Sequence, residues 1–241
     1  GAGEMIAEWI VDKRPSLDLW PLDSRRFSFH HGTKSFMYPR AVEQYAYHYK
    51  MRYPGQEYQT SRELRLSPLY KILKDKGSVY GSKNGWERPL WFAPKGVEPI
   101  DQLDFLNPGW HKYVAEEHRS VREKVALIDQ TSFGKFELFG KGSLELLQYL
   151  TTCNMDKPIG SVIYSQLCNE KGGIEADLTI TRLNLEHFYI VTGSTFGIHD
   201  ADWIRQHIPK EKSIFLIDRF FKLSFNFFFE VYLFFKEGYS K

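Results

Sequence analysis

The chain has 241 residues, of which 42% are apolar and 26% are charged, and its formal net charge is +2. A disordered chain has fewer apolar residues and more net charge, and a collagen-like chain has far more than 18 glycines and 11 prolines. Two cysteines cannot build a disulfide scaffold and favour a reduced, intracellular protein. The near-zero net charge predicts no nucleic-acid partner.

Both ends of the sequence have an unusual composition. The chain starts Gly1-Ala2-Gly3 without an initiator methionine or a signal peptide, which predicts an interior segment of a longer protein. The last 28 residues contain nine phenylalanines. Charged residues interrupt this tail well short of the ~20 apolar residues that a membrane span needs, so we expect no span. Composition leaves open whether the tail is a truncated or mis-spliced end or a natural pair of aromatic-rich strands.

In the first half of the chain, apolar periodicity and cap residues predict helices over residues 4–11, 39–50 and 67–75. Pro39 is expected at a tolerated early helical position, and Ser67-Pro68 is typical of a cap followed by a first-turn proline. Residues 94–110 hold three prolines and two glycines and predict a linker or long loop. We expect residues 1–93 and 94–207 to pack as separate units around it.

The second half gives the clearest β pattern. Alternation predicts a meander of strands over residues 161–168, 174–182 and 187–192, joined by turns at 169–173 and 184–186. Helices are predicted over 111–126, from Ser143, and over 198–207, with a further strand over 135–139. Helices mixed with an antiparallel sheet predict the α+β fold class.

The middle strand of the meander carries the candidate chemistry. Ile174, Ala176, Leu178 and Ile180 share one face, so Asp177 lies on the opposite, polar face. A carboxylate held in mid-strand can accept a hydrogen bond from a substrate amine or act as a base. A solvated polar face is the plainer interpretation. Tyr164, on the preceding strand, can stack on a flat ligand or belong to the core.

Other motifs are weaker. Gly1-Ala2-Gly3 before a helix lets backbone N–H groups approach a phosphate or a flavin. Arg62 and Arg65 can grip a carboxylate or form structural ion pairs. The eight histidines and two cysteines show no zinc-ligand or redox spacing, so no metal site is expected.

Several segments taken in order resemble one family. AEWIVDKRPSLDLWPLDSRRF, TSRELRLSPLYKILKDKGSVYG and NGWERPLWFAP resemble segments at and after the end of the FAD-binding domain in dimethylglycine and sarcosine dehydrogenases. DQTSFGKFELFGKGSLELLQYL, VIYSQLCNEKGGIEADLTITRL, FYIVTGS and HDADWIRQHIP resemble the start of their folate-binding aminomethyltransferase domain, which also forms the glycine cleavage T-protein. The pyruvate dehydrogenase phosphatase regulatory subunit has the same layout and is a close competitor.

The resemblance implies an FAD-dependent oxidation of an N-methyl amine whose one-carbon unit passes to tetrahydrofolate. It implies a catalytic role for Asp177, a folate-pocket role for Tyr164, and cofactor-binding roles for Gly1, Gly3, Gly172 and Gly173. Expected partners are the amine, folate and an electron-acceptor flavoprotein. The expected location is the mitochondrial matrix in a eukaryote and the cytoplasm otherwise.

The resemblance also implies a division into domains. Residues 1–31 are expected to end an FAD-dependent oxidoreductase domain, 32–93 to form its central domain, 94–110 to link, and 111–218 to begin the aminomethyltransferase domain, with 219–241 a divergent aromatic tail. Most of the FAD site and the later folate-pocket strands lie outside these motifs, so we expect this piece to be inactive alone. A non-catalytic regulatory homologue and a mis-predicted gene product stay open as alternatives.

Overall fold

A computed structural model describes residues 1–13, 15–219 and 231–233, the last three as backbone only. Its α-helices are α1 (Ala2–Val11), α2 (Lys34–Ala46), α3 (Tyr70–Asp75), α4 (His111–Glu123), α5 (Ser143–Leu150) and α6 (Gly197–Gln206). Short 3₁₀ helices are η1 (Trp20–Leu22), η2 (Ser24–Arg26) and η3 (Phe29–Gly32). The strands are β1 (Ser78–Lys83), β2 (Trp86–Phe92), β3 (Leu127–Asp129), β4 (Gly134–Phe139), β5 (Val162–Cys168), β6 (Ile174–Asn184), β7 (His187–Thr192), β8 (Phe215–Asp218) and β9 (Val231–Leu233).

The chain forms two compact units, and their boundaries differ from the expected division at residues 94–110. The described part of the first unit comprises residues 1–28 and 134–219, and that of the second comprises 29–133 with β9. The predicted linker contains no helix or strand, as its prolines and glycines indicate. It packs within the second unit, where the Trp91 indole donates to Asp101 at 2.7 Å. The predictions for the aromatic tail from Phe220 onward lie outside the described residues, apart from the backbone of β9.

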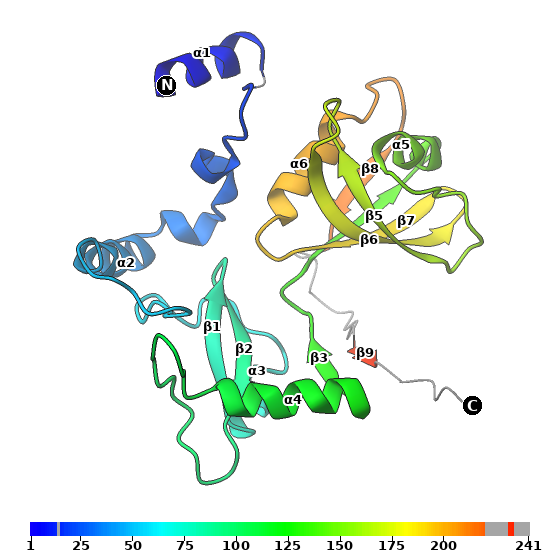
Figure 1. Cartoon of the computed structure of the whole chain (residues 1–241). Helices are drawn as coiled ribbons and strands as arrows, with labels where there is room; N and C mark the ends of the chain where they lie inside the picture. Colours follow the sequence, from blue (N-terminus) through cyan, green and yellow to red (C-terminus); the bar gives the residue numbers. More distant parts are fainter. Residues whose placement is uncertain (14, 220–230, 234–241) are drawn as a thin grey trace. The chain divides into compact units, whose positions relative to one another are not determined.

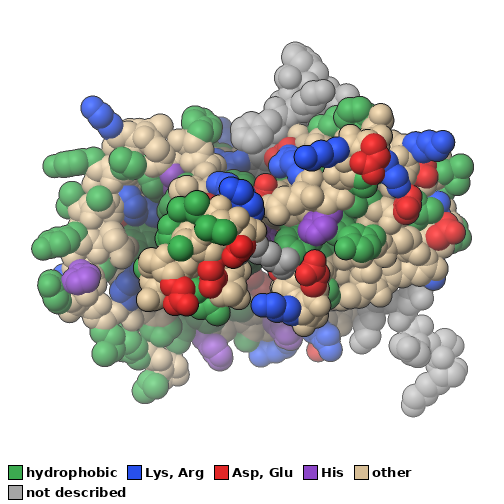
Figure 2. Space-filling model, turned by 90° about the horizontal axis from the view of Figure 1, so that it is seen from above, with side chains coloured by type: hydrophobic (Ala, Val, Ile, Leu, Met, Phe, Trp, Pro, Cys, Tyr) green, Lys and Arg blue, Asp and Glu red, His purple; other side chains and the backbone are tan. Residues whose placement is uncertain are grey.

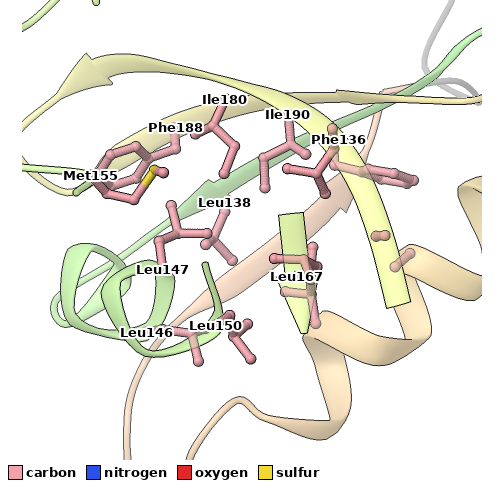
Figure 3. Packing of buried hydrophobic residues seen from close by; sticks show 14 of the residues in the cluster. Phe136, Leu138, Leu146, Leu147, Leu150, Met155, Leu167, Ile180, Phe188 and Ile190 are labelled. Carbon is pink, nitrogen blue, oxygen red and sulfur yellow. The ribbon is translucent and has the colours of Figure 1, made fainter. Parts of the chain in front are cut away.

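The first unit is built on a five-stranded antiparallel sheet in the order β5-β6-β7-β4-β8 (Figure 1). Helices α5 and α6 cover one face, because their apolar residues join the core cluster with the sheet residues that point to that side. Figure 3 shows this packing, with Leu147 of α5 near Leu138 of β4 and Phe188 of β7 close to Met155. The α+β fold class and the meander are confirmed, since the described sheet and helices lie where alternation and periodicity predict them.

Two helices in the first half of the chain begin at other residues than the sequence predicts. Helix α2 begins at Lys34 rather than Pro39, because Thr33 caps it by accepting the Phe36 N–H at 3.3 Å, and Pro39 lies inside the helix. Ser67 does accept the Leu69 N–H at 3.1 Å, but α3 itself begins only at Tyr70.

The β1–β2 hairpin was not predicted. Its turn is Asn84-Gly85, with φ of 49° and 77°. Positive φ at both central residues is typical of two-residue hairpin turns, and Asn-Gly is a preferred sequence for them. Pro89 lies beside the register shift in this ladder, where a missing N–H is tolerated. Helix α4 contacts β2 of this hairpin through the Glu117 carboxylate, which accepts the Phe92 N–H at 2.8 Å. Trp91 also stacks on Tyr113 of α4, with ring centroids 5.3 Å apart.

Charges of both signs are interspersed on the face of the molecule drawn in Figure 2. Blue and red side chains alternate there among apolar ones, without a single-sign stripe. This agrees with the net charge of +2. In the described part of the chain, no helix is long and apolar enough to cross a bilayer.

His30 supplies a pH-dependent prediction for the second unit. Its Nε2 atom is buried with no hydrogen-bond partner among the described residues, and it sits against Gly85, where even a Cβ would approach it to 2.6 Å. Burial, together with the positive charges of His31 and Arg65, lowers the pKa of His30 from 6.5 to about 4. The folded state therefore keeps this imidazole neutral in a range where the unfolded chain takes up a proton.

The contribution of His30 to the free energy of unfolding is fully present above pH 6.5, the pKa of the imidazole in the unfolded chain. It is lost as the pH falls towards 4, the pKa in the folded state. Allowing for solvent screening, we expect a loss of about 1–2 kcal/mol across this window. Urea unfolding of the wild type and of His30→Gln at pH 7, 5.5 and 4.5 tests this. The variant should lose less stability on acidification, and parallel losses would contradict the assignment.

Candidate functional site

The face of the sheet opposite α5 and α6 carries the candidate site. Along β6, Ala176, Leu178 and Ile180 are buried against the helices, whereas Asp177 is exposed and Thr179 half-buried on the other side. Ile174 departs from the expected apolar face because it is 68% exposed at the first position of the strand, beyond the register shift near Cys168. The alternation of β6 is otherwise as predicted.

Tyr164 and Asp177 meet on this face. Tyr164 pairs with Thr179 across the β5–β6 ladder, and Asp177 pairs with Gln166, so the two side chains are diagonal neighbours. The Tyr164 hydroxyl donates a hydrogen bond to the Asp177 carboxylate, and this bond raises the pKa of the phenol above its usual value. The predicted common side, opposite Leu178 and Ile180, is confirmed. An enclosing cavity stays a prediction.

This pair has two chemical capacities. Asp177 retains oxygen lone pairs that can accept an N–H from a ligand, and Tyr164 fixes the carboxylate in place. The Tyr164 side chain is 59% exposed, so its ring offers a stacking surface next to the acceptor. The arrangement fits a flat heterocycle that carries a donor nitrogen.

Backbone geometry accounts for the two glycines in the turn between β5 and β6. Gly172 has a φ of 78°, which favours glycine. At Gly173, a Cβ would lie 2.8 Å from the Asn169 amide nitrogen. The Asn169 Oδ1 accepts the N–H groups of Lys171 and Gly173, both at 2.9 Å, so this asparagine, which sequence reasoning missed, organises the turn. A cofactor contact of either glycine stays a proposal.

Gly1 and Gly3 lie at the start of α1, Gly1 as its N-cap residue. Both are exposed, and no described atom lies within 4 Å of where a Cβ would be. The open space and the helix N-terminus are compatible with the approach of a flavin. The structure brings neither glycine to the Tyr164–Asp177 pair by any described contact, and the flavin role stays a proposal.

A second polar cluster in the first unit is centred on His199 of α6. The His199 Nδ1 atom is 2.9 Å from Oδ1 of the buried Asp200, and its Nε2 atom is 3.6 Å from Glu175. The bond to Asp200, helped by the charge of Glu175, raises the pKa of His199. Trp20 meets the ring edge-on at 4.8 Å. These residues, apart from Asp200, border a cavity of about 330 Å³.

Residues 23–25 are bound to α6 near this cavity by hydrogen bonds between charged side chains. Arg25 donates to Asp23 at 2.9 Å and to Asp202 of α6 at 2.6 Å. Asp23 is 5% exposed, and the Arg25 bonds keep its pKa below the usual value despite burial. These charges satisfy one another, which indicates a structural role.

A third cluster is centred on Glu137 of β4. One of its carboxylate oxygens lies 3.1 Å from the His187 imidazole and 2.5 Å from the Arg219 guanidinium. The Arg219 bond lowers the pKa of Glu137. The cluster borders a cavity of about 580 Å³, which Phe139, Leu185 and Ile217 also line.

The arginine motif near residue 62 has a structural explanation. Arg62 donates to the buried carboxylate of Glu87 at 2.9 Å and to the backbone oxygens of Tyr58 and Tyr80. Its guanidinium is thus bound within the second unit, as the ion-pair interpretation predicts. In the described ranges, no group of three or more His, Cys, Asp or Glu side chains is arranged to hold a metal ion.

Comparison with known families identifies both halves of the chain. The family of the GCVT N-terminal domain matches residues 69–223. The chain belongs to the GCVT N-terminal domain family. Residues 13–67 match the FAD dependent oxidoreductase central domain. The resemblance drawn from the sequence motifs is therefore confirmed, including the order of the two modules.

Three relatives show the range of proteins with this layout. The chain is 35% identical over 223 residues to the mitochondrial pyruvate dehydrogenase phosphatase regulatory subunit of Mus musculus, covering 90% of this chain and 25% of that protein. It is 36% identical over 218 residues to 4-methylaminobutanoate oxidase (formaldehyde-forming) of Paenarthrobacter nicotinovorans, covering 90% and 26%. It is 32% identical over 211 residues to the mitochondrial dimethylglycine dehydrogenase of Homo sapiens, covering 87% and 24%.

The chain thus spans about a quarter of the length of these relatives. Among solved structures, the glycine cleavage system aminomethyltransferase T from Bartonella henselae matches with a TM-score of 0.52 and 24% identity. The match covers 65% of this chain and 38% of that one, and it supports the fold of the GCVT N-terminal module.

Proposed function

We propose that this chain is part of an FAD-dependent N-methyl amine dehydrogenase, of the dimethylglycine or sarcosine type, that passes its one-carbon unit to tetrahydrofolate. The observation that carries the proposal is the Tyr164–Asp177 hydrogen bond on the open face of a GCVT sheet. Support for the oxidative half comes from the match to the FAD dependent oxidoreductase central domain and from relatives named 4-methylaminobutanoate oxidase and dimethylglycine dehydrogenase.

In this proposal, bound tetrahydrofolate supplies the amine nitrogens that take up the one-carbon unit. Asp177 accepts a hydrogen bond from that amine and holds the proton that the amine releases. Tyr164 orients the carboxylate and stacks on the heterocycle, while the Gly172-Gly173 turn lets backbone approach the ligand. FAD supplies the hydride acceptor when bound, and Gly1 and Gly3 form only a small part of its site.

The remaining proposals concern the surroundings of the enzyme. An electron-acceptor flavoprotein would reoxidise the flavin. In a eukaryote we place the protein in the mitochondrial matrix, and the names of two relatives give a mitochondrial location as support. In other organisms we place it in the cytoplasm. We assign residues 13–67 to the central domain of the oxidoreductase and residues 69–223 to the aminomethyltransferase domain, so that the boundary lies near residue 68 and not at the expected linker over 94–110.

The direct test is tetrahydrofolate binding by the full-length protein that contains this chain, measured by calorimetry. Asp177→Asn removes a charge-assisted hydrogen bond of about 1.5–3 kcal/mol, so its affinity should fall about tenfold or more. Asp75→Asn, on an exposed side chain of α3, is the matched control and should bind as the wild type does. Equal affinities of wild type and Asp177→Asn would refute the assigned role.

The alternative is a non-catalytic regulatory homologue, favoured by the 35% identity to the phosphatase regulatory subunit. A regulatory homologue can retain Asp177, so the residue alone does not separate the two functions. In a full-length enzyme, Asp177→Ala should lower methylene transfer to folate and spare flavin reduction by the amine. A full-length protein that shows no flavin reduction by dimethylglycine or sarcosine would favour the regulatory alternative.

A further inference from the structure

A series of polar side chains connects the turn between β5 and β6 to helix α6. Asn169 of this turn donates from its side-chain nitrogen to one carboxylate oxygen of Glu175, at 2.8 Å. The other oxygen of Glu175 lies 3.6 Å from the Nε2 atom of His199, which is on α6. Glu175 therefore joins the turn to the helix, and the function proposed above uses neither Glu175 nor His199.

Buried groups fix the orientation of the His199 ring. Its Nδ1 atom is 2.9 Å from Oδ1 of Asp200, whose side chain is 2% exposed. The Thr192 hydroxyl donates to the other oxygen of Asp200. Because an ionised carboxylate only accepts hydrogen bonds, Nδ1 donates to Asp200, and Nε2 is the nitrogen that faces Glu175. The bond to Asp200, with the charge of Glu175, raises the pKa of His199 and favours a ring that carries a proton on both nitrogens.

The contact between His199 and Glu175 is an ion pair in a partly desolvated place. The two side chains are only 18% and 20% exposed. Trp20 also meets the His199 ring edge-on, with ring centroids 4.8 Å apart. Opposite charges attract more strongly in such surroundings than in water. Trp20 belongs to the stretch that matches the oxidoreductase central domain, so residues of both modules surround this imidazole.

The shape of the turn depends on the Asn169 side chain. Its Oδ1 atom accepts the N–H groups of Lys171 and Gly173, both at 2.9 Å. Gly172 adopts a φ of 78°, and glycine has more backbone conformations open to it than other residues, so the glycines do not fix the turn by themselves. The Asn169 amide is thus bonded to the turn through its oxygen and to Glu175 through its nitrogen.

We propose that His199 and Glu175 are positioning residues for the folate site, which hold the Asn169 side chain in place and thereby order the Gly172-Gly173 turn. The contacts do not depend on the proposed function, but the consequence for folate rests on it. Without the His199 contact, the Glu175 carboxylate can rotate towards solvent, and Asn169 loses a fixed acceptor. The glycine turn then samples more conformations, and ligand binding has to order it again, which lowers the affinity.

The first test measures the turn without folate. Hydrogen exchange of peptides covering residues 169–173 is followed in the full-length protein that contains this chain. Glu175→Leu removes the acceptor of the Asn169 side-chain nitrogen and loosens its bonds to the turn. Exchange should become about three- to tenfold faster, since those bonds are neutral hydrogen bonds. Peptides from β7 should exchange as in the wild type, which shows that the sheet stays folded.

Glu170→Leu is the matched control for this test. Glu170 is an exposed carboxylate of the same turn, and its side chain makes no hydrogen bond or ion pair with the residues that the structure describes. The control should therefore exchange as the wild type does, once the intrinsic exchange rates are corrected for the new side chain.

Two substitutions at His199 separate the roles of its two nitrogens. Asparagine can place its NH₂ group near the position of Nδ1 and keep the bond to Asp200, but it does not reach Glu175. Glutamine can place its NH₂ group near the position of Nε2 and keep a donor to Glu175. We therefore expect faster exchange of the turn in His199→Asn and recovery in His199→Gln. A role limited to satisfying Asp200 would give the opposite order.

The second test is the tetrahydrofolate affinity of the same full-length variants, measured by calorimetry. We expect a loss of about three- to tenfold in Glu175→Leu and His199→Asn. His199→Gln and Glu170→Leu should bind within about twofold of the wild type.

The outcomes separate this inference from the proposed function. If the wild type does not bind tetrahydrofolate, the proposed function fails, while exchange of the turn still decides whether His199 and Glu175 order it. If the turn exchanges equally in wild type, Glu175→Leu and His199→Asn, the positioning role is refuted. If the turn exchanges faster but the affinity is unchanged, the two residues order the turn without serving the site, and the proposal is overturned.

Discussion

Replacing Glu87 by alanine should destabilise the second unit by about 3–5 kcal/mol, the cost of leaving one member of a buried ion pair alone. The Glu87 side chain is 2% exposed, and the Arg62 partner is 20% exposed. Glu87 also accepts the Glu63 N–H at 2.8 Å, so the variant leaves a backbone donor without its acceptor as well. The bond to Glu87 raises the pKa of Arg62 in the wild type. In the variant, the guanidinium keeps its proton without this partner, so its charge loses the Glu87 carboxylate.

Hydrogen exchange of peptides covering the β1–β2 hairpin measures this loss locally, as a fall in protection by a factor of about 10²–10⁴. Glu116→Ala, at an exposed position of α4, is the matched control and should change protection little. The double variant Arg62→Met/Glu87→Leu should recover much of the loss, because it removes both charges. A Glu87→Ala protein with wild-type protection would show that the pair contributes nothing.

The elements that were predicted best are those specified by local pattern. The β5–β6–β7 meander follows from alternation and from the Gly172-Gly173 turn, and the same alternation puts Asp177 and Tyr164 on one face. Gln166 was not singled out, although its position two residues after Tyr164 places it on that face as well.

The features that were missed have identifiable physical causes. The start of α2 depends on the Thr33 cap, which outweighs the preference for proline near a helix start. The Asn84-Gly85 pair is typical of a two-residue hairpin turn, but the flanking segments do not alternate strictly between apolar and polar residues, so no hairpin was predicted there. The division into units depends on long-range contacts, such as those of α4 with β2, which no local pattern in the sequence reports.

Leu147→Ala should destabilise the first unit by about 2–5 kcal/mol. Leu147 is completely buried on α5, where it packs against the covered face of the sheet (Figure 3). Truncation removes its transfer free energy and leaves a cavity that rigid strands on one side and a helix on the other cannot easily close. The effect should reach β4 and β7, because both contribute to the same cluster.

Leu185→Ala provides the matched comparison, since Leu185 is 65% exposed in the turn between β6 and β7 and should change stability by less than about 0.5 kcal/mol. Urea unfolding, with hydrogen exchange of peptides from β4 and β7, distinguishes the two variants. The unequal effects expected here follow from the burial of Leu147 between α5 and the sheet and the exposure of Leu185 in a turn. Equal effects would contradict the packing of α5 on the sheet.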